Sequence, residues 1–285
     1  MNVDVLSALV RALSFIAQLQ AAGVAIFIAV FGRHLSAASR EVRRIGFYSA
    51  VAGIVLVFVH YGLEAARMAG ALSGVFDLSL QQLVLETPLS TAWILRSAGL
   101  ALIVGSIRSD GVRAAGVCVL GAILTLAAFL LVGHTATDPA RISLAVLLIV
   151  HLVVVAFWFG ALLPLHAISD KESELQAARV VDDFSRIAIW LVPVILLAGV
   201  LMTVLLVDRW TVFAESYGLL LLAKVAAFAA LMGLAAMNKW RYGPALATTR
   251  AAAVGFQRAV MFEYALICAV LIATAIMTTF FSPEH

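Results

Sequence analysis

The sequence predicts an all-α polytopic membrane protein, a bundle of eight transmembrane helices, and composition and hydropathy carry this prediction. Of the 285 residues, 64% are hydrophobic and only 12% are charged, whereas soluble domains are about half apolar and about a quarter charged. Mean hydropathy is +1.08. Apolar runs of the about 20 residues that cross a bilayer recur along the whole chain. No run alternates like a barrel strand, and backbone in lipid must satisfy its own hydrogen bonds, so each run is expected to be a helix.

Charged or glycine- and proline-containing breaks divide the chain into its expected spans, which cover about residues 5–31, 44–68, 90–107, 111–132, 142–165, 185–207, 217–237 and 258–280. The start lacks the basic region and the cleavage site of a signal peptide, so 5–31 is expected to be the first span. Between the second and third spans, SGVFDLSLQQLVLETPLS is expected to form a helix on the membrane surface. Residues 1–285 are predicted to be one integral membrane domain, with a four-helix half at 1–132 and a second half at 133–285.

Basic residues are distributed unevenly between the two sets of loops. The opposite loops hold three, Arg67, Arg141 and Arg209, and the loops after the first, third, fifth and seventh spans hold thirteen, namely Arg33, Arg40, Arg43, Arg44, Arg108, Arg113, Lys171, Arg179, Arg186, Lys239, Arg241, Arg250 and Arg258. The positive-inside rule therefore predicts that both termini lie outside, N-out and C-out. Membrane orientation accounts for these charges, so membrane lipids are expected neighbours and nucleic acid is not an expected partner.

Seven ionisable side chains fall inside or at the edge of the predicted spans, and the orientation places all of them in the outer half: Arg11, His60, Glu64, Arg96, His134, His151 and Lys224. Ionisable groups in the membrane interior are costly and are functional candidates by default. His151 is expected about 14 Å from the start of its helix, near the midplane. Glu64 lies one turn from His60 on the same helix face. Glu263 is expected in the cytoplasmic half.

Three imidazoles and a carboxylate on different helices are suited to a transition metal, because imidazole binds copper and zinc and copper(II) accepts mixed nitrogen and oxygen ligands. The predicted metal ligands are His60, His134, His151 and Glu64. Met68 lies one further turn along the second helix and would offer a thioether to copper(I). Supporting or gating roles are predicted for Trp158, Arg96, Lys224, Arg11 and Glu263.

Structural roles remain open for the same residues. The imidazoles could join neighbouring helices by hydrogen bonds, and Lys224 could extend toward the membrane surface. Glu64 could be the counter-ion of Arg96 or Arg11, and Glu263 could pair with Arg258 or with backbone. A tryptophan such as Trp158 more often packs against neighbouring helices than contacts a cofactor.

The basic side chains Arg11, Arg96 and Lys224 keep a second class of function open, because positive charge repels copper ions. They could instead bind lipid headgroups, quinone oxygens or haem propionates. His60 and His151 would then hold haem b in a membrane redox protein, such as a copper reductase. A copper sensor or scaffold without transport is a third hypothesis. No nucleophilic triad, phosphate loop or nucleotide motif is present, so neither an enzyme nor an ATP-driven pump is expected.

Several motifs of the second half resemble one known family. HLVVVAFWFGALLPL is similar to the H-L-x(5)-W-x-G-x-L-x-x-L segment of the CopD/PcoD copper-resistance inner-membrane proteins. The resemblance continues in GHT, in DDFSRIAIWLVPVILLAGV, in YGLLLLAKVAAFAALMGLAAMN and in FQRAVMFEYALICAVLIATAIMTTFFSP. Residues 1–110 are similar to the family in architecture.

The resemblance implies an eight-helix bacterial inner-membrane protein of copper handling. It also implies copper uptake into the cytoplasm, with a small periplasmic copper-binding protein of the CopC type as partner. The residues that match the family's pattern are His134, His151, Trp158, Gly160, Phe184, Ser185, Arg186, Lys224, Asn238 and Glu263.

Overall fold

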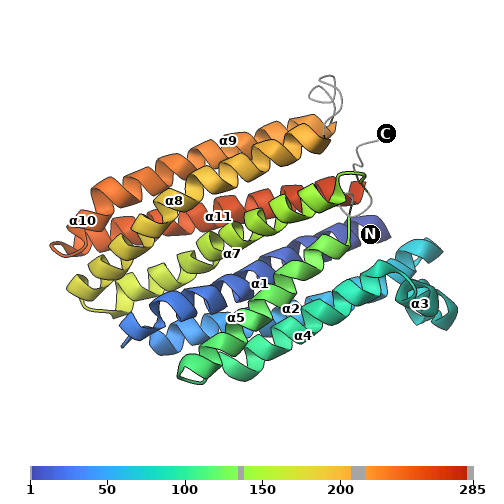
Figure 1. Cartoon of the computed structure of the whole chain (residues 1–285), viewed down its shortest axis with the longest axis horizontal. Coiled ribbons are helices and arrows are strands. Elements are labelled where there is room, and N and C mark those ends of the chain that lie inside the picture. Colours follow the sequence, from blue (N-terminus) through green and yellow to red (C-terminus); the bar gives the residue numbers. More distant parts are fainter. Residues whose placement is uncertain (1, 134–137, 207–215, 281–285) are drawn as a thin grey trace.

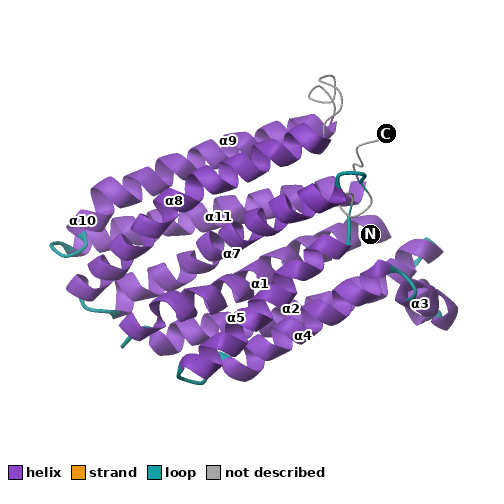
Figure 2. Ribbon diagram, viewed as in Figure 1, coloured by secondary structure: helices purple, strands orange, loops and turns teal. Residues whose placement is uncertain are grey.

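The structure, a computed structural model, describes residues 2–133, 138–206 and 216–280. Within these ranges every regular element is a helix, as Figure 2 shows. Eight of the helices are long and apolar enough to cross a membrane, which confirms the predicted fold class and number of spans.

The first half contains four spans and a short extra helix. The spans are α1 (Val3–Phe31), α2 (Ser39–Ala69), α4 (Pro88–Ser106) and α5 (Val112–Ala127), the last continued by the 3-10 turn η3 (Ala128–Leu131). The turn η1 (Gly32–His34) joins α1 to α2, and η2 (Leu72–Phe76) with α3 (Leu78–Leu85) fills the connection from α2 to α4. Asp77 caps α3 by accepting the backbone N–H groups of Ser79 and Leu80, so the expected helix in this connection is present.

The second half contains the other four spans, several of them longer than predicted. They are α7 (Arg141–Lys171), α8 (Glu174–Leu206), α9 (Ser216–Met237) and α11 (Arg250–Phe280); the π-helical turn η5 (Asn238–Tyr242) and the short α10 (Gly243–Ala245) follow α9. The extensions are charged turns beyond the apolar stretch. In α8, for example, Arg186 forms an ion pair with Asp182 one turn earlier, at 2.6 Å. Such a pair stabilises a helical turn that lacks apolar residues.

The helix α1 runs through the centre of the bundle (Figure 1). It packs against α2 and α5 on one side and against α7 and α11 on the other. Its apolar stretch is mostly buried, whereas few residues in the apolar stretch of the α9 span are buried. Side chains on α1 therefore contact both halves of the protein.

The two ends of the bundle differ in charge. The starts of α1 and α3 and the end of α11 lie at one end, and α10 lies at the opposite end (Figure 1). The connections that carry Arg33, Arg108 and Lys171 are at the α10 end, which we call the basic end, and the other is the terminal end. The side of the membrane that each end faces stays a prediction.

A close crossing of two backbones joins the halves. A Cβ atom on Gly160 of α7 would lie 2.8 Å from the backbone N of Val24 on α1, and one on Gly23 would overlap the Ala156 carbonyl. Pro164 has no N–H to donate to the Gly160 carbonyl one turn earlier. The Gln20 amide of α1 donates to that carbonyl instead, at 3.2 Å. The proline of α7 is thus accommodated by a side chain of the neighbouring helix.

Glu172, just after α7, caps the start of α2 at the basic end. Its carboxylate accepts the Ser36 N–H at 2.7 Å, the Ser36 hydroxyl at 2.6 Å and the Ala38 N–H at 2.9 Å. Burial acts to raise the pKa of this carboxyl, but the hydrogen bonds from Ser36, Ala38 and Ala37 outweigh it, so the pKa lies below its usual value. Ala38, at the N-cap position of α2, has no side chain that could cap the helix, so the Glu172 carboxylate does this instead.

Candidate functional site

A cluster of ionisable side chains lies between α1 and α2 near the terminal end. Arg11 of α1 donates from Nε to Nε2 of His60 at 3.2 Å and from Nη2 to Oε1 of Glu64 at 3.4 Å. Nε2 of His60 is itself 3.5 Å from Oε1 of Glu64, one turn further along α2. We call these three residues the outer cluster, after the side of the membrane on which the positive-inside rule predicts them. The structure confirms that His60 and Glu64 share one helix face and that Arg11 is the counter-ion of Glu64.

Further hydrogen bonds connect the outer cluster to its surroundings. Arg67 donates to Oε2 of Glu64 at 3.2 Å and to Asp4 at 3.1 Å. Arg11 also donates to the backbone carbonyl of Thr278, close to the end of α11, at 3.0 Å. Three spans therefore meet at the cluster, and Glu64 stays paired with Arg67 even without Arg11.

The hydrogen bond from Arg11 determines the protonation state of His60. Because Nε2 accepts this bond, it carries a lone pair, and the ring proton is on Nδ1 of a neutral imidazole. The residue is only 8% exposed, and the positive charges of Arg11, Arg96 and Arg67 all act on its ring. The lone pair that a metal would use is thus occupied by a guanidinium.

Arg96 of α4 is buried in the same region. Its guanidinium lies over the ring of Phe129, 4.7 Å from the centroid, and its Nε has no hydrogen-bond partner in the described chain. A ring face attracts a cation and so compensates part of the cost of burying this charge. Among the described residues Glu64 pairs with Arg11 and Arg67 and not with Arg96.

His151 has different neighbours from His60. It lies against the backbone of Ile195 on α8, and Lys224 of α9 acts on its charge. Its Nδ1 is buried and has no hydrogen-bond partner within the described ranges. The two imidazoles thus have different charged neighbours: Arg11, Arg96 and Arg67 around His60, and Lys224 near His151.

Two predicted ligands remain, His134 and Met68. His134 lies outside the described residues. Met68 is 51% exposed at the end of α2. Counting only residues 2–133, 138–206 and 216–280, no three His, Cys, Asp or Glu side chains converge as a metal site would require. The structure thus brings His60 and Glu64 together and leaves His151 apart from them.

A second buried cluster joins α7, α9 and α11. Glu263 of α11 accepts a hydrogen bond from Nε1 of Trp158 at 3.3 Å and another from Nδ2 of Asn238 at 2.5 Å. We call these three residues the inner cluster. The expected pairing of Glu263 with Arg258 is wrong, because Arg258 is exposed on another face of α11. Trp158 donates a hydrogen bond in addition to packing. Asn238 is neutral, so the only signal in the sequence that marked it as a site residue was its match to the family's pattern.

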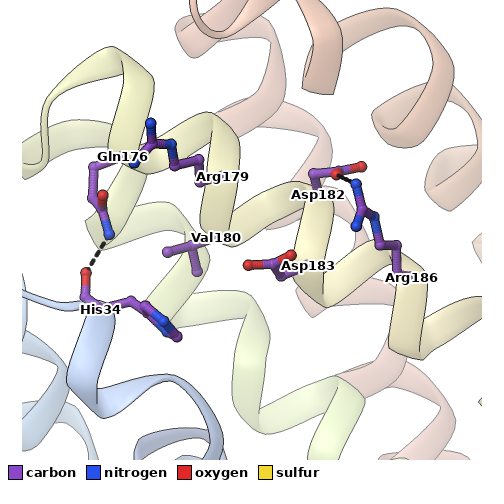
Figure 3. A pocket seen from close by; sticks show the side chains of 7 residues that line it. All are labelled: His34, Gln176, Arg179, Val180, Asp182, Asp183 and Arg186. Atoms are coloured by element: carbon purple, nitrogen blue, oxygen red, sulfur yellow. Dashed lines mark hydrogen bonds and ion pairs between the residues drawn. The ribbon is translucent and has the colours of Figure 1, made fainter.

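A cavity of about 390 Å³ opens at the basic end, between η1 and α8 (Figure 3). Gln176 donates to the backbone carbonyl of His34 at 2.6 Å, and Asp182 pairs with Arg186. The lining residues are His34, Gln176, Arg179, Val180, Asp182, Asp183 and Arg186. The cavity is at the opposite end from the outer cluster, and the sequence analysis did not predict it.

The fold and the two clusters define a class: a multi-pass helical membrane protein with ionisable side chains buried between its helices. Residues 1–143 match the family model described as copper resistance protein D-like, N-terminal domain, and residues 178–277 match copper resistance protein D. Copper resistance protein D of Pseudomonas syringae pv. tomato is 31% identical over 212 residues, which cover 69% of this chain and 68% of that protein. No solved structure matches the chain.

The chain therefore belongs to the CopD family of copper-resistance membrane proteins. The predicted resemblance is confirmed, and it extends further than the motifs indicated. The first half, for which the sequence predicted similarity to the family only in architecture, matches a separate family model for the N-terminal domain.

Proposed function

We propose that this protein binds copper at the terminal end of the bundle, facing the periplasm, and transports it across the bacterial inner membrane into the cytoplasm. In this proposal a CopC-like periplasmic protein delivers the ion. The observation that carries the proposal is the pair formed by Nε2 of His60 and Oε1 of Glu64, 3.5 Å apart on one face of α2 in a copper-resistance family protein. A nitrogen and an oxygen at this spacing suit copper(II) as two ligands of one ion.

Arg11 occupies the place of the cation in the described state. It donates to both atoms that copper would use, so its guanidinium must withdraw before the ion binds. Glu64 keeps its ion pair with Arg67, so its carboxylate stays compensated while copper replaces Arg11. Arg11 thereby makes the empty site stable and excludes weakly binding cations.

His151 is proposed as a later ligand on the same route. Its Nδ1 is buried without a partner among described residues, so a lone pair is available once the proton is on Nε2. Because His151 does not converge with His60 and Glu64, copper would reach it in a separate step. His134 and Met68 are proposed as ligands at the entrance.

Copper binding and transport are tested with purified protein in proteoliposomes that contain a copper indicator. We expect His60→Ala and His134→Ala to lower copper affinity and His151→Ala to abolish uptake. The matched control is His166→Ala, because His166 lies on α7 near the basic end. Unchanged binding in His60→Ala and His134→Ala would refute the site. Binding without uptake in the wild type would refute transport and favour a sensor or scaffold.

A further inference from the structure

Glu263 lies near the middle of α11, about 20 Å along the helix from its start at Arg250 and about 22 Å from Thr278 at the outer cluster. Its side chain is buried, with 3% exposure. Each carboxyl oxygen accepts one hydrogen bond, and the donors, Trp158 and Asn238, are both neutral. The carboxyl group is therefore hydrogen-bonded but not compensated by charge.

No ionisable group of the surrounding elements supplies that charge. Within the described ranges, none of the following makes a hydrogen bond or an ion pair with Glu263: Arg11 of α1, His151 and His166 of α7, Lys224 of α9, Lys239, Arg241 and Tyr242 of η5, and Arg258 and Tyr264 of α11. An ionised carboxylate buried without a cation costs several kcal/mol. Taking up a proton removes that cost.

Asn238 can bind both forms of the carboxyl group. Its Nδ2 donates to Glu263, which suits the carboxylate. Its Oδ1 is buried and has no partner in the described chain. Rotating the amide by half a turn would place Oδ1 where it accepts a hydrogen bond from the protonated acid, since an amide offers a donor and an acceptor of similar shape.

The backbone places Asn238 at a special position. It is the first residue of η5, a π-helical turn that interrupts the regular end of α9. Such turns are rare and occur frequently at functional sites, where they displace a side chain from the α-helical register. Here the displaced side chain reaches across to α11.

We propose that Glu263 is a proton-binding site in the centre of the bundle, and that Asn238 and Trp158 hold its carboxyl group in both protonation states. The site lies about 22 Å from the outer cluster along α11 and shares no residue with it. It therefore binds its proton independently of copper and goes beyond the proposed function. When the proton leaves, the bonds from Trp158 and Asn238 strengthen, so α7, η5 and α11 respond to the change.

The test is infrared spectroscopy of the purified full-length protein without copper, as a function of pH. We expect a carbonyl band of a protonated carboxyl group that Glu263→Gln removes. The matched control, Glu64→Gln, leaves the band in place, because Glu64 forms ion pairs with Arg11 and Arg67 whereas Glu263 has no cationic partner among the described residues. Asn238→Ala keeps Glu263 and should shift the band, since one hydrogen-bond partner is lost.

A band that persists in Glu263→Gln would overturn the proposal, as would the absence of any such band at every pH at which the protein is folded. If Glu263→Gln does not fold, an unshifted band in Asn238→Ala overturns it. Trp158→Phe should remove a pH-dependent part of the fluorescence of the five tryptophans. All these measurements omit copper, so their failure is distinguishable from failure of the proposed function.

Discussion

Replacing Gly160 with alanine would place a methyl group where the backbones of α7 and α1 touch. The new Cβ atom would lie 2.5 Å from the carbonyl carbon of Gly23 and 2.8 Å from the backbone N of Val24. Carbon atoms in favourable contact are about 3.5–4.0 Å apart. Backbone atoms cannot rotate away as a side chain can, so the two helices must separate by about 1 Å at the crossing.

The net cost follows from three contributions. Overpacking at such a contact costs about 1–3 kcal/mol. Separating the helices also weakens the hydrogen bond from Gln20 to the Gly160 carbonyl, which contributes about 1 kcal/mol. Alanine favours the helix over glycine by about 1 kcal/mol, which offsets part of the loss. We expect Gly160→Ala to lower the free energy of unfolding by about 1–3 kcal/mol.

The matched control is Gly233→Ala in α9, where an added Cβ atom meets nothing within 4 Å. This control should be neutral or stabilising by up to about 1 kcal/mol. The assay is denaturant unfolding of both variants and the wild type in the same detergent, followed by helix content. A Gly160→Ala protein as stable as Gly233→Ala would refute the close crossing.

Three further outcomes are expected. Glu172→Gln should lower the free energy of unfolding by about 1–2 kcal/mol. Because the folded protein holds the pKa of Glu172 below its usual value, this difference from wild type is full above about pH 5 and disappears as the pH falls through the folded pKa. Denaturation of both proteins at several pH values measures it. Arg11→Gln should raise copper affinity by about tenfold or more, since it removes the competing cation. Arg44→Gln, at the exposed basic end, should leave the affinity unchanged. Equal copper affinities of Arg11→Gln and wild type in a metal titration would contradict the exchange of cations. Glu263→Ala should leave copper stoichiometry unchanged but destabilise the protein by about 1–3 kcal/mol for each buried donor left unpaired. A loss of bound copper in this variant would place Glu263 in the copper site.

Local patterns predicted the pair of His60 and Glu64 correctly, because residues four apart on a helix must share a face. The same reasoning listed Arg11 as one of two counter-ions of Glu64 and could not choose between them. The choice depends on which face α1 turns toward α2, and that is a property of packing. His151 illustrates the limit more strongly: its depth in its helix is predictable, but its contacts with α8 and α9 are not.

The sequence by itself determined that this protein is a bundle of eight membrane-spanning helices, because lipid forces each apolar run to satisfy its backbone internally. It also determined which residues are costly to bury. Only the tertiary structure decided which partners they find: Arg11 donates to His60 and Glu64, and two neutral donors, Trp158 and Asn238, bind Glu263. The physical reason is that helix crossings, such as the contact of Gly23 with Gly160, depend on the shapes of two surfaces at once, which a pattern along one chain does not contain.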